Sequence, residues 1–561
     1  MKKITFIVAF FIIIISSFAQ QVKWGELNEN KSKFYAPTIV GADKNGLYTY
    51  YFDKEDIIIE RHDKENLKLV YEQKIKKPKI KKCAITIEKI LYIKGNFIFI
   101  SNNYYRKEKR TEIIATFYDG ESGRQLKKKI KLFDISSIKN KRKSSFVIRI
   151  SPDKSKLLIN LTSDLKKDKQ IVDRFILLDE DFNVLLKKED VFERNNLTDK
   201  YIRNFIIDND GTIYSFLYYS ESLKLLVFDA AKNFELWEEF VDITKYNNKD
   251  KILLPLDINY TINNEDEFVV NLLYNNVMVA MNKYGEKFEK AKTYKDIRDL
   301  TKSISALDGI LYFRIDKETK EITVSKDNEI SQEIKNEYRT KKEIKKDKPG
   351  SIIYAFKYNF SKLYSCQNGG VTSVNEAYYS VAKAGYFSSW FHYYIDILSF
   401  NFDKEGSLKW VNTIPVKQYF SYHNKFLGVF YSHSIGHWSS FFIRPNYSFG
   451  RPKTYLLDYF FSISSYSNNY FYEIFNDNPK NINLDDKDKK RKYMTKPLKS
   501  VPVIYAIDIN TGKKEKKVFT DLQNEDVVFA PTVSYNRGIG SSMIVFGKKG
   551  KKYKYGVLKF N

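Results

Sequence analysis

The chain has 561 residues, a hydrophobic fraction of 43% and a formal net charge of +26. A chain of this length can bury a large interior without covalent staples, and its two cysteines, Cys83 and Cys366, are too few and too far apart for a disulfide framework. The composition therefore excludes a disulfide-rich scaffold, and we expect two buried free thiols.

The positive charge raises the question of a nucleic-acid partner. The lysines, however, are dispersed among abundant Asn, Ile, Tyr and Phe, and arginine, which binds phosphate better, is scarce. Lysine-rich stretches occur at residues 76–82, 139–143, 341–348 and 487–492. This dispersion indicates solvated loops and strand edges, so we expect no nucleic-acid partner.

Residues 1–20 have the pattern of a secretory signal peptide, with two lysines, an apolar core at 4–15 and a Ser-Ser-Phe-Ala stretch. We expect cleavage near Ala19 or Gln20; an uncleaved membrane anchor is the alternative. No cysteine follows the apolar core, which argues against a lipoprotein, and no later stretch is apolar enough to span a bilayer. We therefore expect residues 21–561 to be exported to the periplasm, the cell surface or the medium.

From residue 36 onward the sequence repeats a unit of short apolar runs bounded by Asp, Asn and Gly. The clearest copy is 201–243, with a tight turn at Asp208-Asn209-Asp210-Gly211. It predicts four strands, at 201–207, 212–219, 223–229 and 234–241. Such a sheet has two apolar faces and is stable only when it stacks on similar sheets. We predict five consecutive units, at 36–76, 85–133, 146–192, 201–243 and 254–294.

The most regular part of the unit is the link between its third and fourth strands. An apolar run ends in an acidic or Asn-containing turn, and a more charged strand follows. A charged fourth strand is expected at the solvated outer edge of a propeller blade. The link occurs at residues 60–75, 115–132, 175–191, 226–241, 278–294, 398–414 and 504–520.

The second half of the chain is less regular. We predict loop insertions near residues 334–350, 418–452 and 481–499, of which the first and third are rich in charge and the second in aromatic residues and histidine. The last segment, from residue 527, supplies only three strands, and residues 22–27 could provide the fourth. The predicted fold is all-β, a single β-propeller of about seven or eight four-stranded blades closed by pairing of the N- and C-terminal strands.

Two segments of the C-terminal third resemble a family of uncharacterised exported proteins of Gram-negative bacteria. They are residues 393–418 (YYIDILSFNFDKEGSLKWVNTIPVKQ) and 471–481 (FYEIFNDNPKN). The resemblance implies a propeller-like fold and carries over no activity and no catalytic residue.

Two kinds of residue in this part of the chain are candidates for binding. His433 and His437 are four residues apart, a spacing that suits a metal on a helix, but Gly436 and strand-like neighbours argue against a helix. Exposed aromatic side chains can stack on sugar rings or anchor a protein partner, although packing between blades is the alternative for each of them. The candidate binding residues are Trp390, Tyr393, His433, His437 and Trp438, with no metal or other cofactor expected.

No enzyme motif stands out, since the sequence lacks G-x-S-x-G, P-loop and G-x-G-x-x-G patterns. The turn at Asp208 begins like a calcium loop but lacks the later ligands. We expect an exported, non-enzymatic, monomeric propeller that binds a protein or glycan at the cell envelope or outside the cell. The alternatives are a glycan-acting enzyme with carboxylates at the channel mouth, and a purely structural envelope protein; the sequence leaves the ligand open.

Overall fold

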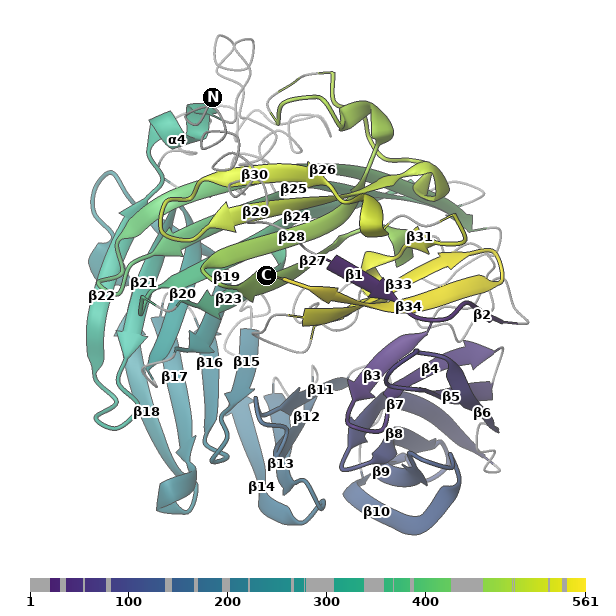
Figure 1. Cartoon of the computed structure of the whole chain (residues 1–561). Helices are drawn as coiled ribbons and strands as arrows, with labels where there is room; N and C mark the ends of the chain where they lie inside the picture. Colours follow the sequence, from purple (N-terminus) through teal and green to yellow (C-terminus); the bar gives the residue numbers. More distant parts are fainter. Residues whose placement is uncertain are drawn as a thin grey trace, which may run out of the picture. The chain divides into compact units, whose positions relative to one another are not determined.

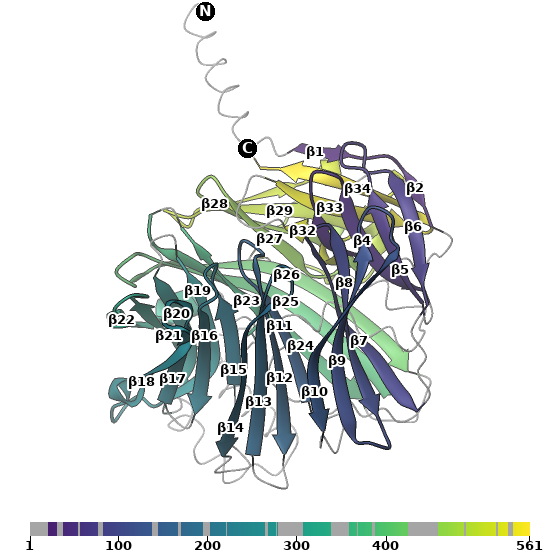
Figure 2. The ribbon, with the colours of Figure 1, turned by 90° about the horizontal axis from the view of Figure 1, so that it is seen from below.

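The structure is a computed structural model, and its strands are shown in Figures 1 and 2. It describes residues 21–30, 37–53, 56–76, 82–136, 144–165, 170–193, 202–219, 222–263, 267–276, 278, 307–337, 358–366, 368–383, 388–424, 458–486, 488, 490–522, 525–536 and 542–560. These residues form two compact units, described separately below. We call them the 37–245 unit and the 246–561 unit, the second of which also includes residues 21–30.

The 37–245 unit consists of four antiparallel sheets, each made of four strands that are consecutive in the sequence. Blade 1 contains β3 (Thr38–Ala42), β4 (Leu47–Asp53), β5 (Asp56–His62) and β6 (Leu69–Ile75). Blade 2 contains β7 (Cys83–Ile93), β8 (Asn96–Tyr105), β9 (Arg110–Asp119) and β10 (Gln125–Ser136). Blade 3 contains β11 (Ser144–Ile150), β12 (Lys156–Leu165), β13 (Gln170–Asp179) and β14 (Val184–Glu193). Blade 4 contains β15 (Ile202–Ile207), β16 (Ile213–Tyr219), β17 (Ser222–Asp229) and β18 (Glu235–Asp242), with short 3-10 helices at Ala230–Lys232 and Thr244–Tyr246.

The 246–561 unit also contains four antiparallel sheets. Blade 5 contains β19 (Leu253–Ile262), β20 (Phe268–Asn276), β21 (Gly309–Ile315) and β22 (Ile322–Glu329), and is followed by the helix α4 (Gln332–Glu337). Blade 6 contains β23 (Tyr358–Ser365), β24 (Val371–Lys383), β25 (Ser388–Phe402) and β26 (Leu408–Asn424). Blade 7 contains β27 (Ser462–Ser467), β28 (Tyr470–Asp477), β29 (Val501–Asp508) and β30 (Lys514–Val518), with 3-10 helices at Pro479–Asn481, Pro497–Lys499 and Thr520–Leu522. Blade 8 contains β31 (Val528–Phe529), β32 (Tyr535–Asn536), β33 (Ser542–Lys549) and β34 (Lys552–Lys559), with a 3-10 helix at Pro531–Val533 and two strands from the start of the chain, β1 (Gln21–Trp24) and β2 (Asn28–Glu29).

The fold is a β-propeller of eight antiparallel blades, which confirms the all-β prediction and the higher of the two predicted blade counts. The core lies between successive sheets. In one buried cluster, Ile113 and Leu132 of blade 2 join Leu157 of blade 3. In another, Ile414 of blade 6 joins Phe471 of blade 7. Within each unit, neighbouring blades therefore bury their apolar faces against one another, as the repeat requires.

Blade 8 is completed by the start of the chain, as predicted from residues 22–27. β1 pairs antiparallel with β34, from Gln21 opposite Lys559 to Trp24 opposite Gly556 (Figure 2). The Trp24 indole covers Gly556, where a Cβ atom would lie 3.0 Å from Trp24 Cε3. Its Nε1 donates a hydrogen bond to the carbonyl of Asp521 at 2.8 Å. Pairing of this kind removes an open sheet edge and joins residues 21–24 and 552–559 in one sheet.

The predicted link between the third and fourth strands is a turn that one aspartate organises. Its carboxylate accepts hydrogen bonds from backbone N–H groups two to four residues later, which is an Asx-type turn. The aspartates are Asp63, Asp119, Asp179, Asp229, Asp316, Asp403 and Asp508. A left-handed residue follows each one before the fourth strand begins; these residues are Leu67, Gly123, Phe182, Phe234, Lys320, Gly406 and Gly512.

At Gly123, Phe182, Gly406 and Gly512 the left-handed residue of the turn meets the preceding blade. At Gly512 a Cβ atom would lie 2.5 Å from Cγ of Trp410 in blade 6, and Trp410 Nε1 donates to the carbonyl of Ile509 at 2.7 Å. At Phe182 the turn supplies the aromatic ring itself, which packs edge-on against Phe117 of blade 2 with ring centroids 5.0 Å apart. A glycine in this position is therefore matched by an aromatic side chain from the blade before it.

The prediction that residues 278–294 form the third-to-fourth link of blade 5 is wrong. The third strand is β21 (Gly309–Ile315), which pairs with β20, and the link is the turn at Asp316. All seven residues of β21 are buried, as a central strand paired with β20 on one side and β22 on the other requires. The apolar run that starts at Met278 has the composition of a strand, but the residues that pair with β20 are those of β21.

Candidate functional site

Blade 6 has the longest strands among the described residues. Strands β24, β25 and β26 contain 13, 15 and 17 residues and stay paired to their far ends (Figure 1). Two predicted site residues lie on this extension. In the backbone register Trp390 is opposite Tyr422 of β26, and Tyr393 is opposite Tyr419. The fold thus places both candidates on β25, opposite residues 418–424; these residues begin the predicted insertion at 418–452 but form the end of β26 rather than a loop.

The other three candidates, His433, His437 and Trp438, lie outside the described residues. The structure describes how the strand that leads into residues 425–450 is held. We call this polar assembly, centred on Gln418, Asp477 and Arg491, the anchor.

The anchor begins with the segment between β28 and β29, residues 478–500. Met494 in this segment donates its N–H to the carbonyl of Lys417 at 2.8 Å and accepts from Tyr419 N–H at 3.1 Å. Gln418, between these two residues, therefore forms an isolated parallel bridge with Met494. Two of the predicted insertions, 418–452 and 481–499, thus meet at backbone hydrogen bonds beside the end of β26.

The side chain of Gln418 ties the same strand to blade 7. It is fully buried, donates from Nε2 to the carbonyl of Asn476 at 2.9 Å, and accepts from Phe461 N–H at 2.6 Å. Asn476 in turn donates from Nδ2 to the carbonyl of Phe529 in blade 8 at 2.8 Å. A buried amide that satisfies both donor and acceptor roles is expected to rigidify its surroundings.

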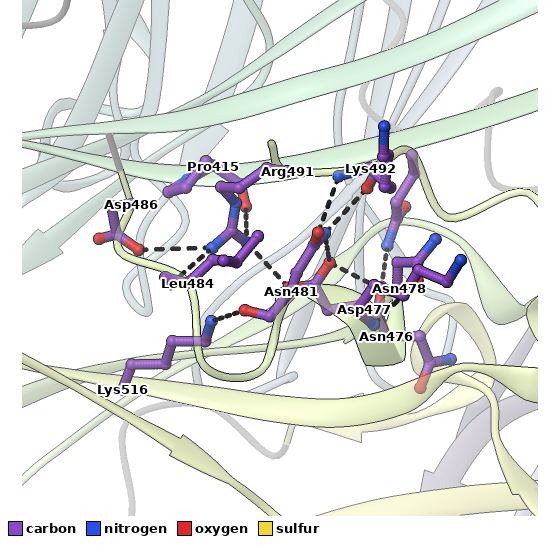
Figure 3. Close-up of polar contacts among 12 residues, drawn as sticks. Pro415, Asn476, Asp477, Asn478, Asn481, Leu484, Asp486, Arg491, Lys492 and Lys516 are labelled. Carbon is purple, nitrogen blue, oxygen red and sulfur yellow. Dashed lines mark hydrogen bonds and ion pairs between the residues drawn. The ribbon is translucent and has the colours of Figure 1, made fainter. Parts of the chain in front are cut away.

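Arg491 lies at the centre of the anchor, and Figure 3 shows its contacts. Its side chain is fully buried, and Nη2 donates to Asp477 Oδ2 at 2.8 Å and to the carbonyl of Pro415 on β26 at 3.2 Å. Nη1 donates to the carbonyl of Leu484 at 3.4 Å and lies 3.9 Å from Asp486 Oδ1. One guanidinium thus joins blade 6, the end of β28 and the 478–500 segment.

Asp477 is the direct counter-ion of Arg491 and is fully buried as well. It also accepts from Asn481 Nδ2 and from the N–H of Asn478, both at 2.7 Å. Burial raises the pKa of the Asp477 carboxyl, and Arg491 and Asn481 oppose that shift because they stabilise the anion. A buried ion pair of this kind is costly to break because either partner alone would be an uncompensated charge.

A further carboxylate, Asp396 on β25, lies at the edge of the anchor. It is 2% exposed, and burial raises its pKa to about 7, while Lys417 and Arg491 act in the opposite direction and Asp486 adds to the rise. Within the described part of the chain its carboxylate has no hydrogen-bond or ion-pair partner. An aspartate in this state titrates near neutral pH.

The anchor is built to hold the strand rather than to do chemistry. Arg491 and Asp477 are out of contact with solvent, and their partners are protein groups. In the described ranges no group of three or more His, Cys, Asp and Glu side chains could hold a metal ion. Asp477 and Arg491 were not singled out by the sequence analysis, which treated 481–499 as a charged insertion; the one available clue was the single Arg among its many lysines.

Two further sequence hypotheses can be placed in the structure. Asp208 Oδ1 accepts from the N–H groups of Gly211 and Thr212 at 3.2 and 2.9 Å, and Oδ2 accepts from the Tyr214 hydroxyl at 3.1 Å, so the turn uses the oxygens that a calcium ion would need. Cys83 and Cys366 are both free, with Cys83 half-buried and Cys366 buried. Burial raises the pKa of the Cys366 thiol to about 11, which favours the unreactive thiol form.

Across the described residues, no helix combines the length and apolarity needed to cross a membrane. No protein-family model matches the chain, and no curated protein matches its sequence.

Solved structures similar to this chain include propeller domains, exported or uncharacterised bacterial proteins, and enzymes such as prolyl endopeptidases and an exo-β-1,3-galactanase. The WD40 domain of SCAP from fission yeast shares 9% identity with a TM-score of 0.37, and the alignment covers 97% of this chain and 98% of that one. A protein of unknown function from Bacteroides caccae shares 13% identity with a TM-score of 0.26, over 67% and 94% of the two chains. A protein described as exported, from Bacteroides fragilis, shares 10% identity with a TM-score of 0.23, over 64% and 84%. All three TM-scores are below 0.5, so the fold assignment rests on the strand order of this chain itself.

Proposed function

We propose that the protein is an exported, non-enzymatic, monomeric propeller that binds a macromolecule, a protein or a glycan, through the extension of blade 6 and residues 418–452. The observation that carries this proposal is the anchor. The fold uses a buried ion pair and a buried amide to hold the one strand that leads into the aromatic insertion.

A firm base is what a binding surface on an insertion requires. Binding residues are commonly carried by loops that a rigid scaffold positions, and ordering a loose surface costs affinity. The extension of β25 and β26 is rich in Tyr, Phe and Trp, residue types that bring large contact areas at low entropic cost. Trp390 and Tyr393 are the residues that we assign to this surface, with His433, His437 and Trp438 in the insertion.

Export supports the same assignment. The predicted signal peptide at residues 1–20 would deliver the chain to the periplasm, the cell surface or the medium, where proteins and glycans of the envelope are the available partners. Fusion of residues 1–20 to a reporter enzyme that is active only outside the cytoplasm tests this step, and a reporter that stays inside the cell would contradict it.

The binding proposal is tested by comparing the whole chain with a variant in which residues 425–450 are replaced by a short Gly-Ser linker. This deletion keeps Gln418 and Met494, so the anchor stays intact. On a glycan array and in pull-downs from envelope extracts, we expect the deletion to abolish capture. Equal capture by the two chains would refute the proposal.

Point variants sharpen the test. The double substitution Trp390→Ala and Tyr393→Ala is expected to weaken binding by at least about tenfold, as for aromatic anchors in other interfaces. Phe240→Ala is the matched control, since Phe240 is 59% exposed on β18 of blade 4. Release of products from any glycan that binds would show instead that the protein is an enzyme.

A further inference from the structure

A cleft in the 37–245 unit, far along the sequence from the extension of blade 6, has the character of a second binding site. It has a volume of about 370 Å³ and lies between β10 of blade 2 and strands β13 and β14 of blade 3. Pockets that bind small ligands or peptide side chains begin at about this size. Its lining combines an apolar wall with charged side chains; the residues that matter are Phe133, Asp134, Ile135, Arg174, Lys187 and Glu189.

The apolar wall of the cleft arises from an irregularity in β10. The pairing of β10 with β9 shifts register between Lys131 and Phe133, so Leu132 and Phe133 are both buried although they are consecutive. A bulge of this kind redirects side chains, and bulges are common next to functional sites. Beyond it Phe133 and Ile135 join the buried cluster between blades 2 and 3, and together they form one side of the cleft.

The opposite side of the cleft carries two cationic side chains, Arg174 and Lys187, that carboxylates of the protein neutralise only in part. Arg174 is 16% exposed, and its Nε lies 2.7 Å from Glu189 Oε2, but its terminal nitrogens have no partner among the described residues. Lys187 Nζ lies 5.9 Å from the centre of the Phe133 ring and has no carboxylate partner in the described ranges. Guanidinium and ammonium groups so placed offer several free donors to an anion.

The carboxylates near the cleft do not cancel this charge. Asp134 is already paired with Lys131 at 2.9 Å and with Arg110 at 3.3 Å, which holds the pKa of the Asp134 carboxyl below its usual range. Glu189 faces Arg174 through Nε alone and is 53% exposed, so solvent weakens its effect. Among the described residues, the cleft therefore presents the ammonium group of Lys187 and the two terminal nitrogens of Arg174 to a ligand, beside the ring of Phe133.

We propose that this cleft binds an acidic side chain of an extended peptide, with an adjacent apolar residue of the same peptide against Phe133 and Ile135. The carboxylate accepts from the terminal nitrogens of Arg174 and from Lys187 Nζ. A peptide fits better than a free small anion because the cleft places cationic groups beside an apolar wall of Phe133 and Ile135, so that one acidic and one apolar side chain of the same ligand are both matched.

The test uses the full chain and a fluorescent acetylated octapeptide of alternating Glu and Leu, with binding followed by anisotropy in 50 mM and 300 mM NaCl. We expect saturable binding that salt weakens, and at least about tenfold weaker binding by Arg174→Gln or Lys187→Gln, because charge-assisted hydrogen bonds are lost. Arg174→Lys keeps the charge but not the forked geometry, so its affinity for the peptide is expected to lie between those of the natural chain and of Arg174→Gln.

Because the chain is basic, general attraction for acids must be separated from binding in the cleft. Lys232→Gln removes the same charge from an exposed position in the same unit and is expected to change the affinity less than about twofold. The exposed Lys187 is not part of the core, so its variant tests the proposal even if Arg174→Gln folds poorly. The proposal is overturned if Lys187→Gln and Lys232→Gln behave alike, if a peptide with Gln in place of Glu binds equally well, or if hexanoate competes with the peptide at equal concentration.

Discussion

Arg491 in the 246–561 unit and Arg174 in the 37–245 unit both lie where two neighbouring blades meet, yet their guanidinium groups are used differently. Arg491 is fully buried, and both terminal nitrogens donate to protein oxygens of Asp477, Pro415 and Leu484. Arg174 is 16% exposed, and only its Nε has a partner among the described residues.

The contrast separates an arginine that organises the fold from one that is available to a ligand. A guanidinium whose terminal nitrogens bind protein groups fixes the relative position of the strands that supply those groups. A guanidinium with free terminal nitrogens in a cleft contributes little to folding and can bind an incoming anion. Four substitutions test this contrast, in order of decreasing expected effect.

Removing the buried cation should have the largest effect. Arg491→Met keeps the length of the side chain but leaves Asp477 buried without its counter-ion, so we expect a loss of about 3–5 kcal/mol in unfolding free energy, measured by urea denaturation. Combining it with Asp477→Asn should recover part of the loss because the stranded charge is removed. A loss of less than about 1 kcal/mol for Arg491→Met would show that the ion pair with Asp477 contributes little to the stability of the fold.

Disrupting an uncharged contact between blades 6 and 7 should lower the unfolding free energy by less. Gly512→Ala places a Cβ atom 2.5 Å from Trp410 Cγ at a residue with φ of +70°, and we expect a loss of about 2–3 kcal/mol from strain and displaced packing. Gly550→Ala is the matched control, since φ there is +64° but no atom lies within 4 Å of the new methyl group. Its expected cost is about 1 kcal/mol, from the backbone alone. Equal losses at the two positions would show that Trp410 yields without cost.

Asp396, the carboxylate at the edge of the anchor, should make the stability of the protein depend on pH. Asp396 has a pKa of about 7 in the folded chain, above its value of about 3.9 in unfolded chains, so the unfolded state loses its proton first and stability falls as pH rises from about 4 to 7. Asp396→Asn removes this dependence. We expect the variant to be more stable than the natural chain by about 1–3 kcal/mol at pH 8 and equal to it near pH 4.

The opposite sign is expected at Asp526, which serves as the control for this measurement. A hydrogen bond from Lys554 holds the pKa of the Asp526 carboxyl below its usual value, so its ionisation favours the folded state and Asp526→Asn should destabilise slightly above pH 4. Thermal melting of both variants between pH 4 and pH 8 distinguishes the two cases. A stabilised Asp396→Asn at pH 4 would point to packing rather than charge.

The smallest effect on stability is expected at the exposed arginine. Arg174→Gln loses one partly solvated ion pair with Glu189, so the unfolding free energy should change by less than about 1 kcal/mol. A loss as large as that of Arg491→Met would place Arg174 among the residues that organise the fold and would remove the contrast between the two arginines.

Much of the fold could be predicted from the sequence because its strands are short, apolar and bounded by turn residues. The four strands of blade 4 begin and end within one residue of their predicted positions, and six of the seven predicted third-to-fourth links are the Asp-centred turns of the structure. Local sequence was sufficient there, since one aspartate and one left-handed residue define each turn. It was insufficient in blade 5, where the third strand follows a long segment and only its pairing with β20 identifies it.

By itself, then, the sequence determined the class of fold and the Asp-centred turns, because these depend on residue patterns within a few positions of one another. The terminal strand that completes blade 8 could be predicted because the last repeat lacked one strand and residues 22–27 offered it. Only the tertiary structure showed that Met494 binds Lys417, that Arg491 pairs with Asp477, and that Phe133 faces Lys187 across a cleft. The reason is physical: the energy of a buried charge or a hydrogen-bonded amide depends on which groups surround it, and those groups come from strands far apart in the sequence.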